Sequence, residues 1–503
     1  MASLIIPFLA SVLLLGGVQA VELVRSVDNT TATCATACST LRTALPGKVF
    51  GASDTAGYQE SKSEYFSDWN GDINPACFVV PTEAEDVALI VKTAKDTRCP
   101  FAAKSGGHTY FQSASNIENG ITIDFRGLNQ VTPNGDGTVS LGTGGRWGEV
   151  YDALDPLNIT VLGGRLRHIG VGGLLLGGGT SFLTPGHGFA CDNICRYQVV
   201  NADGEIIWAS QETNPDLFWA LRGGASNFGL VVRFDVDTVP GSNFWGGTID
   251  YDISQLQSVA SAFGALADPE TKDDKATTWI VVLRQPAANS WTINTVPIYS
   301  EPVTETPKIF EPFVNIPSTK KNLRVARHGV FANESLDAPN GFRCDGFVIT
   351  MKFNTDIVEY AVNKAKSEPF SNNTQLLAIS LGFQQFGQTT LTHTNVRGGN
   401  PMGLGDSGPL IMIQLQFFWL KNESSPLDQE IQSAGKQFIA DLGAWAEEQG
   451  HENSYIYLNY ADKSQDVFGS YGQANKERMQ RISKQYDPEG VFQKLMPGGL
   501  KLF

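Results

Sequence analysis

The sequence predicts an α+β protein of at least two domains. Its 503 residues exceed the roughly 250–300 residues at which a single hydrophobic core stops growing. A strand–helix–strand pattern fills residues 78–103. After about residue 245 the pattern changes to alternating apolar segments separated by helices, which predicts an antiparallel sheet with helices on one face.

The first part of the chain contains the clearest elements. Residues 78–81 form a predicted strand, and the next helix is expected to begin with a capping box of Thr82 and Glu85 and to end near Arg98. Further predicted elements are strands at 101–103, 121–124 and 139–141, a hairpin over 197–208 that turns at 201–204, and a short helix capped by Asn214.

The residues after about 245 follow a different pattern of predicted elements. Its predicted strands are 278–283, 375–383 and 410–420, and its predicted helices are 355–367 and 427–449. The end of the chain changes again, with an aromatic run over 455–460 that predicts a strand and a charged helix over 475–486 that Asp487-Pro488 ends.

The charge balance excludes several classes of partner. Lys and Arg number 37 and Asp and Glu number 52, so the formal net charge is −15. Such a surface repels phosphate backbones and anionic lipids, so we expect neither a nucleic acid nor a membrane as partner. A hydrophobic content of 42% with 18% charged residues indicates a packed globular chain.

The N-terminus predicts secretion. An apolar run from Leu4 to Ala20 ends in small residues, which favours a cleaved signal peptide over residues 1–20 rather than a membrane anchor. Five N-x-S/T sequons fit a secreted glycoprotein, and they are Asn29, Asn158, Asn333, Asn372 and Asn422.

The chain has seven cysteines. Four precede residue 100, at Cys34, Cys38, Cys77 and Cys99, so we expect two disulfides there and leave their pairing open. The odd count leaves at least one thiol unpaired. No nearby histidine completes a zinc ligand set, so no metal is expected.

Several catalytic motifs are absent. The chain has neither the phosphate-binding G-x-x-x-x-G-K-[ST] pattern nor the dinucleotide pattern G-x-G-x-x-G, and it has no H-E-x-x-H zinc motif. Residues 405–409 imitate the nucleophile loop of trypsin-like proteases but lack its second glycine and its partner segments, so they are interpreted as a turn.

Two glycine-rich segments are more informative. Lys104-Ser105-Gly106-Gly107-His108 follows a predicted strand, and a second segment runs from Gly170 to Gly179. Backbone N–H groups in such turns can converge on an anion because no Cβ atom blocks the approach. Together with Arg222-Gly223-Gly224, they favour a large planar or diphosphate ligand over ligand-free loops.

These segments resemble berberine-bridge-enzyme-like flavoproteins of the vanillyl-alcohol oxidase / p-cresol methylhydroxylase superfamily. The matches occur in order along the chain: Lys104 to His108, Gly163-Gly164-Arg165, Gly170 to Gly179, Cys191-Asp192-Asn193, Ala220 to Gly224, Asn227 to Gly229, Tyr457 to Asp462, and Pro497-Gly498-Gly499. The secreted flavin oxidases of fungi are the most similar type.

The resemblance implies a two-part FAD-binding domain of the p-cresol methylhydroxylase type. Its parts would be residues 21–245 and 455–503, and residues 246–454 would be an inserted substrate-binding domain on an antiparallel sheet backed by helices. It also implies FAD as cofactor, a small-molecule substrate and O2 as the electron acceptor.

The resemblance assigns roles residue by residue. His108 matches the histidine bonded to the flavin, and Lys104, Ser105, Gly106 and Gly107 would hold the pyrophosphate. The remaining matches in cofactor-binding segments are Ser113, Ile169, Gly170, Gly173, Gly177, Asp192, Asn193, Tyr457 and Asn459.

Two positions depart from the family pattern. Leu166 stands where many relatives have a second flavin-bonding cysteine, so a single covalent link through His108 is expected. Ile169 stands where a smaller valine accompanies oxidase behaviour, so a dehydrogenase with poor O2 reactivity is the alternative to an oxidase.

Tyr457 and Asn459 match a Y-x-N motif beside the flavin ring, and they are the predicted catalytic residues. Tyr457 is the candidate base, which requires neighbours that lower its pKa from about 10. Tyr110, His168 and His187 are weaker candidates for lining the pocket.

The substrate class stays open between three possibilities. A hydroxylated or phenolic secondary metabolite is favoured, because the nine Trp residues do not cluster as an oligosaccharide groove requires. The alternatives are an extracellular carbohydrate oxidase and a secreted flavoprotein without turnover.

Overall fold

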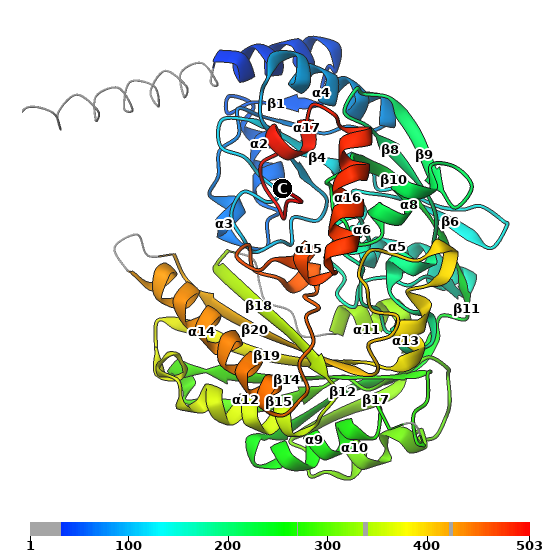
Figure 1. Cartoon of the computed structure of the whole chain (residues 1–503), viewed down its shortest axis with the longest axis vertical. Helices are drawn as coiled ribbons and strands as arrows, with labels where there is room; N and C mark the ends of the chain where they lie inside the picture. The colour runs from blue at the N-terminus through cyan, green and yellow to red at the C-terminus, as the bar shows by residue number, and fades with distance from the viewer. Residues whose placement is uncertain (1–31, 269, 335–340, 422–425) are drawn as a thin grey trace, which may run out of the picture.

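The computed structural model describes residues 32–503 except 269, 335–340 and 422–425. The predicted signal peptide and the sequons at Asn29 and Asn422 lie outside the described residues. Figure 1 shows one half that contains both ends of the described chain and another half dominated by a large sheet. No helix in the described ranges is long and apolar enough to cross a bilayer.

A small sheet with strand order β1-β2-β4-β3 begins the first half. Its strands are β1 (Val49–Phe50), β2 (Cys77–Val79), β3 (Phe101–Lys104) and β4 (Ile121–Asp124), and helices α2 (Thr55–Lys62), α3 (Asp68–Gly71) and α4 (Ala84–Thr97) lie between them. β2 and β3 both pair in parallel with β4, so the predicted strand–helix–strand unit is confirmed.

The predicted cap of α4 is wrong. The helix begins after Glu83, and Thr82 lies outside it. The Asp86 carboxylate from the first turn accepts the Thr82 N–H at 2.8 Å and pairs with the Lys48 ammonium. Asp86 therefore accepts the Thr82 N–H that the capping box would have assigned to Glu85.

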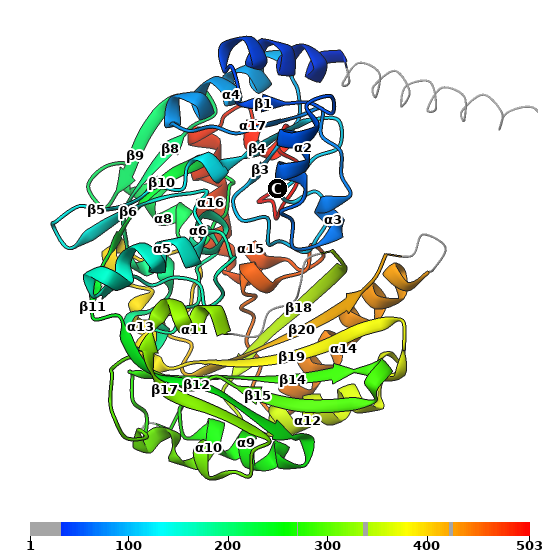
Figure 2. The same ribbon diagram turned by 180° about the vertical axis from the view of Figure 1, so that it is seen from behind.

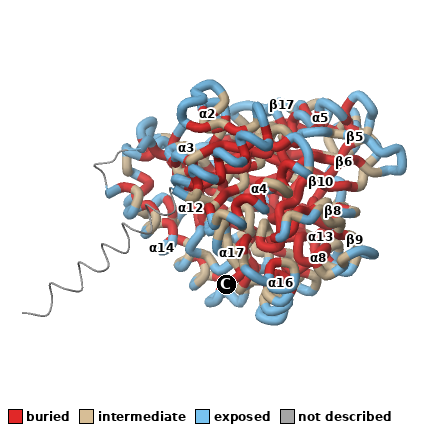
Figure 3. Tube along the Cα trace, turned by 90° about the horizontal axis from the view of Figure 1, so that it is seen from above, coloured by how far each residue is buried: buried red, intermediate tan, exposed pale blue. Residues whose placement is uncertain are grey.

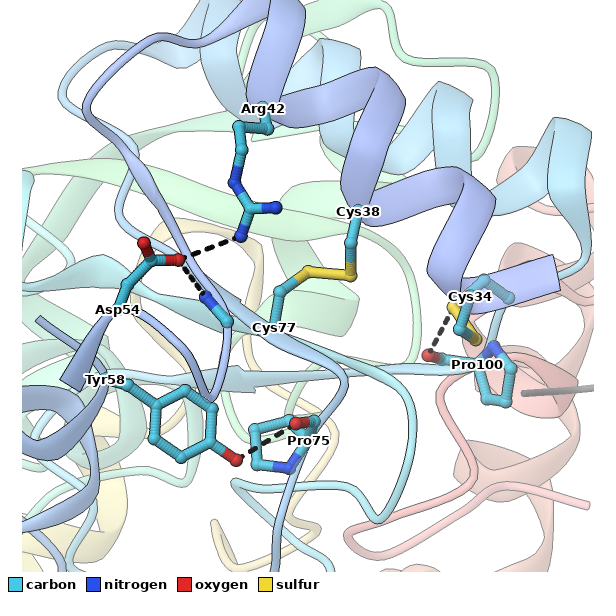
Figure 4. The surroundings of a disulfide bond; sticks show 10 residues. Cys34, Cys38, Arg42, Asp54, Tyr58, Pro75, Cys77 and Pro100 are labelled. Atoms are coloured by element: carbon cyan, nitrogen blue, oxygen red, sulfur yellow. Dashed lines mark hydrogen bonds and ion pairs between the residues drawn. A yellow bond between two sulfur atoms is a disulfide. The ribbon is translucent and has the colours of Figure 1, made fainter. Parts of the chain in front are cut away.

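Two disulfides hold the helix over residues 32–44 to this sheet. Cys34 bonds to Cys99 and Cys38 bonds to Cys77, so the two predicted N-terminal disulfides are confirmed and their pairing is known. Figure 4 shows the Cys38–Cys77 bridge beside the Arg42–Asp54 ion pair. The bridges attach the start of the described chain at two points, which restricts its unfolded ensemble.

A second, antiparallel sheet has the strand order β5-β6-β10-β8-β9. Its strands are β5 (Val131–Pro133), β6 (Thr138–Gly142), β8 (Ile194–Val200), β9 (Ile206–Ser210) and β10 (Leu230–Asp237). The predicted hairpin is confirmed, because β8 pairs with β9 across a turn closed by Asn201 and Glu205. Helices α5 (Trp147–Leu154), α6 (Val171–Leu176), α7 (Thr184–His187) and α8 (Pro215–Leu221) accompany it, and β7 (Ile159–Thr160) pairs with β11 (Val239–Pro240).

The other half is built on a large antiparallel sheet. Its order is β13-β16-β12-β15-β14-β19-β20-β18, with β17 paired to β12. The strands are β12 (Asn243–Asp252), β13 (Ala276–Thr277), β14 (Trp279–Gln285), β15 (Ser290–Thr295), β16 (Ile298–Tyr299), β17 (Lys320–Arg327), β18 (Arg343–Lys352), β19 (Leu376–Phe386) and β20 (Leu410–Trp419).

Helices cover one face of this sheet and leave the other face for the first half (Figure 2). They are α9 (Leu256–Gly264), α10 (Glu311–Asn315), α12 (Asp356–Ser367) and α14 (Leu427–Glu448), and their apolar residues form one core with the sheet. Trp279, Phe386 and Met412 belong to a different core, shared with residues 139–236 and 455–502. The predicted α+β arrangement is therefore present.

The C-terminal residues return to the first half. Helices α15 (Val467–Ser470), α16 (Gln473–Tyr486) and α17 (Val491–Lys494) lie there, and the Leu495 carbonyl accepts the Phe101 N–H at 2.7 Å. The Tyr486 hydroxyl donates to Asp216 of α8 at 2.9 Å. In the view of Figure 3 buried chain runs continuously through the interior of this half. The domain boundaries at 245 and 454 stay predictions.

The predicted strand over 455–460 is wrong. Residues 453–457 are extended without a strand partner, and Leu458–Tyr460 forms a 3-10 turn. Tyr455 and Tyr457 are buried in the same core as residues of α6, without pairing in a sheet.

Candidate active site

The two glycine-rich segments touch each other. A Cβ atom on Gly106 would lie 2.4 Å from the backbone nitrogen of Gly170, so only glycine allows this approach. The Ser105 hydroxyl bridges the segments, since it donates to the Thr143 carbonyl at 2.7 Å and accepts the Gly172 N–H at 3.2 Å. The turn after β3 and the start of α6 therefore form one surface.

This surface has room for a ligand. Gly173 lies on the exposed side of α6, and a Cβ atom there would meet no other atom within 4 Å. On Gly177, by contrast, a Cβ atom would lie 2.1 Å from the Asn459 side-chain oxygen. An open, uncharged glycine floor beside backbone N–H groups fits a flat ring system joined to a diphosphate.

His108 is held between two rings at the edge of this surface. Its ring centroid lies 4.1 Å from that of Phe66 and 5.3 Å from that of His168. Burial, His168 and Arg146 lower the pKa of His108 to about 3, so the imidazole is neutral. A neutral imidazole has a nitrogen lone pair available for a bond to carbon.

Lys104 points away from the glycine surface. Its ammonium forms a buried ion pair with Asp124 at 3.1 Å and donates to the Ser61 carbonyl at 2.7 Å. Burial lowers the pKa of this amine. Only the backbone of Lys104 is therefore placed for the predicted contact with a pyrophosphate.

Asp192 and Asn193 brace the loop beneath the site. Asp192 accepts hydrogen bonds from the Phe189 N–H and the Asn400 amide, and burial raises its pKa to about 6. The Asn193 amide donates to the carbonyls of His187 and Phe189. Both side chains are engaged within the protein, so they shape the loop.

The other predicted cofactor residues lie at loop contacts. Ser113 has a positive φ of 65°, and its carbonyl lies where a Cβ atom on Gly498 would be 1.6 Å away, so only glycine fits beneath it. Half-buried Ile169 sits between His168 and Gly170, and its carbonyl accepts the Trp147 N–H at 3.1 Å.

Tyr457 and Asn459 face the glycine segment. The Tyr457 hydroxyl oxygen accepts the Thr180 N–H at 3.0 Å and the Asn459 amide at 3.2 Å, and Asn459 also donates to the Leu174 carbonyl at 3.1 Å. Burial nevertheless raises the pKa of Tyr457 to about 12. The expected lowering of this pKa is therefore wrong, because desolvation outweighs both donors.

Tyr460 lies beside Tyr457 and has hydrogen-bond donors of its own. Its hydroxyl oxygen accepts a hydrogen bond from the Arg165 guanidinium at 2.9 Å and another from the Gln384 amide at 3.2 Å. Its ring packs edge-on against Tyr457 at 4.9 Å. Tyr460 and Arg165 lie in matched segments, but sequence reasoning gave neither a role; Gln384 carried no signal.

Tyr110 closes the side of the site toward the large sheet. A Cβ atom on Gly346 of β18 would lie 2.6 Å from the Tyr110 ring, so the hydroxyl end of the ring packs against this glycine. Burial and the nearby Cys344, Tyr460 and Asp462 raise the pKa of its hydroxyl. His187 lies on the loop that Asn193 braces, apart from these groups.

Two family descriptions match this chain. Residues 75–210 match the FAD binding domain, and residues 456–494 match the family described as berberine and berberine like. An FAD-dependent monooxygenase of Fusarium proliferatum is 37% identical over 462 residues, which cover 88% of each chain. This chain belongs to the berberine-bridge-enzyme-like family of FAD-dependent oxidoreductases. Its cofactor is FAD, as the sequence resemblance implied.

Solved structures confirm the fold of this berberine-bridge-like enzyme. Glucooligosaccharide oxidase from Acremonium strictum superposes with a TM-score of 0.74 at 21% identity, covering 90% of this chain and 96% of its own. Two variants of the protein Phl p 4 superpose with TM-scores of 0.70 and 0.71 at 16% and 17% identity, covering 91% and 93% of this chain and 96% and 99% of their own. They differ by an isoleucine-to-valine change; the valine variant is a glucose oxidase and the other is a glucose dehydrogenase.

Proposed function

We propose that this enzyme is an FAD-linked oxidase that removes hydride from an alcohol or phenol-type small molecule and produces H2O2 from O2. Bound FAD would supply the hydride acceptor and return the electrons to O2, while the chain orients the substrate and moves its proton. The fungal relative named a monooxygenase, at 37% identity, supports a flavin-dependent oxidation with O2.

The observation that carries the proposal is the pair of donors on Tyr460. The Arg165 guanidinium and the Gln384 amide both donate to the phenol oxygen, so they fix the position of the Tyr460 hydroxyl at the site. Tyr460 is half-buried, so a substrate can reach it, whereas Tyr457 is only 1% exposed and retains its proton. We assign removal of the proton from the substrate O–H to Tyr460. We assign to Tyr457 the ring packing that holds Tyr460 in place.

The covalent link through His108 is part of the proposal. The neutral imidazole between Phe66 and His168 supports it, and so does Leu166, which leaves no thiol at the second tether position. Secretion is proposed with it, supported by the two disulfides and by the exposure of Asn158, Asn333 and Asn372.

The second candidate function is a carbohydrate oxidase, which the glucooligosaccharide oxidase fold similarity favours. A panel of benzylic alcohols, phenols and oligosaccharides, assayed for anaerobic bleaching of the flavin and for H2O2 release in air, separates the two. We expect bleaching by alcohols or phenols with one equivalent of H2O2 per substrate. Bleaching by oligosaccharides alone would reject the favoured substrate class, and no bleaching by any member would reject the oxidase.

A further inference from the structure

Arg165 is a cation without a carboxylate partner in the part of the chain that the structure describes. The neighbouring arginines differ, because Arg146 pairs with Glu64 and Arg167 pairs with Asp152, both at 2.6 Å. Arg165 instead donates to the Tyr460 hydroxyl and lies 4.3 Å above the Trp279 ring. A guanidinium has five N–H donors, so several are left for a ligand.

Three distant parts of the chain bring Arg165 to the site. The residue follows Gly163 and Gly164 and precedes the glycine segment, its partner Tyr460 comes from the C-terminal part, and Trp279 begins β14 of the large sheet. Gln384 of β19 completes the group through Tyr460. The guanidinium is half-buried, which strengthens its attraction for an anion relative to a fully solvated arginine.

The surroundings of Arg165 are flat and aromatic. Trp279 stacks on Phe182 with ring centroids 5.7 Å apart and an interplanar angle of 20°, and it is 8% exposed. These buried rings give the guanidinium an apolar setting on one side, where it attracts a negatively charged oxygen more strongly than it would in water. A neutral sugar would leave the guanidinium uncompensated.

We infer that Arg165 recognises an anionic oxygen, so that the substrate is an aromatic compound with a carboxylate or an ionised phenol. This inference rests on the proposed function for the identity of the site, and it deepens that function by naming the substrate class. Arg165 is thus a specificity-determining residue, with one N–H group on Tyr460 and further N–H groups that would bind the anionic oxygen.

Binding of simple probes to the flavin-loaded enzyme tests the inference. Benzoate and pentafluorophenol represent the two sources of negative charge, and benzamide and benzyl alcohol are their neutral counterparts. In calorimetric titrations we expect at least one anion to bind about tenfold more tightly than its neutral counterpart, with binding weakened by salt. Benzoate or pentafluorophenol as the tighter ligand identifies the source.

Substitutions at Arg165 test whether this residue causes the preference for anionic probes. Arg165→Met should abolish the preference for the anion, Arg165→Lys should restore part of it, and the matched control Arg167→Met should keep it. Equal binding of anions and neutral probes, or an undiminished preference in Arg165→Met, would overturn the inference. If alcohols bleach the flavin but anions bind no more tightly than neutral probes, the inference about Arg165 fails and the proposed function is retained. If anions bind more tightly but no alcohol bleaches the flavin, the proposed function fails and the inference about Arg165 is retained.

Discussion

Tyr460 and Tyr457 are neighbours with the same side chain and opposite surroundings. Tyr460 accepts one hydrogen bond from a guanidinium, whereas burial raises the pKa of Tyr457 to about 12. Tyr460→Phe should lower the rate of anaerobic flavin reduction by about 10²–10⁴-fold, the usual effect of losing a general base. Tyr457→Phe, the matched control, should lower it far less. Equal losses, measured by stopped-flow absorbance, would contradict this division of roles.

The neutral imidazole of His108 makes a second prediction. His108→Ala should release all flavin into the supernatant on acid precipitation, while the wild-type protein keeps its yellow colour in the pellet. Leu166 supplies no second bond, so no partial retention is expected. A variant whose denatured pellet still fluoresces would show that the flavin is attached elsewhere.

Ile169 makes a third prediction at the residue scale. Ile169→Val removes one methylene beside the glycine segment, and we expect the reduced enzyme to react faster with O2. The check is the rate of flavin reoxidation after mixing with air-saturated buffer, and an unchanged or slower rate would refute it.

At the scale of elements, Gly173 inside the short helix α6 and Gly177 directly after it have opposite environments. Ala at Gly173 meets open space and improves helix propensity by about 1 kcal/mol, so apoprotein stability should be unchanged or slightly higher, while FAD occupancy falls. Ala at Gly177 would strike Asn459 and should lower the melting temperature. Thermal melts and the ratio of flavin to protein absorbance distinguish the two. Full flavin content in Gly173→Ala would mean that α6 does not face the cofactor.

Most elements were predictable because local patterns specify them. The strand at 121–124 and the helix ended by Asp487-Pro488 occur as expected. The strand over 455–460 failed because aromatic composition favours a strand only where a partner strand exists, and these residues lie against glycines instead. Thr82 failed for a related reason, since Asp86 took over the backbone bond.

The site was predictable only in part. Glycine-rich turns are recognisable from the local sequence, so both of the segments that meet at Gly106 and Gly170 were identified. The bond of Arg165 to Tyr460 joins residues 295 positions apart, and Gln384 joins from a third segment. Sequence spacing does not indicate that these distant residues contact one another. It also cannot show that burial outweighs hydrogen bonding in setting the pKa of Tyr457.

At the scale of the whole molecule, His328 joins the two halves. It is fully buried, shares a hydrogen bond with Thr160 at 2.7 Å, and packs against Tyr151 at 3.9 Å and Phe244 at 5.1 Å. Burial lowers its pKa from 6.5 to about 3. Below pH 6.5 the His328 imidazole is protonated in the unfolded chain but stays neutral in the folded chain. This difference lowers the free energy of unfolding by about 2 kcal/mol at pH 5.

His328→Phe should remove that dependence. Buried acids such as Asp192, whose pKa is raised to about 6, oppose it in the wild-type protein, so the difference between the two proteins is the relevant quantity. Urea unfolding at pH 8 and pH 5 should show the variant losing about 2 kcal/mol less than the wild type. Parallel losses would mean that His328 is protonated in the folded state.

The return of the C-terminal residues to the first half has a consequence for biosynthesis. Tyr457, Asn459 and Tyr460 emerge from the ribosome after the entire large sheet, yet they line the surface that the earliest glycine turn begins. A chain that ended at a premature stop codon after residue 454 would contain both glycine segments and all the strands given above. It would lack the residues Tyr457, Asn459 and Tyr460 that face those segments. We therefore expect FAD to be bound only after translation is complete, so that a yellow product reports a full-length chain.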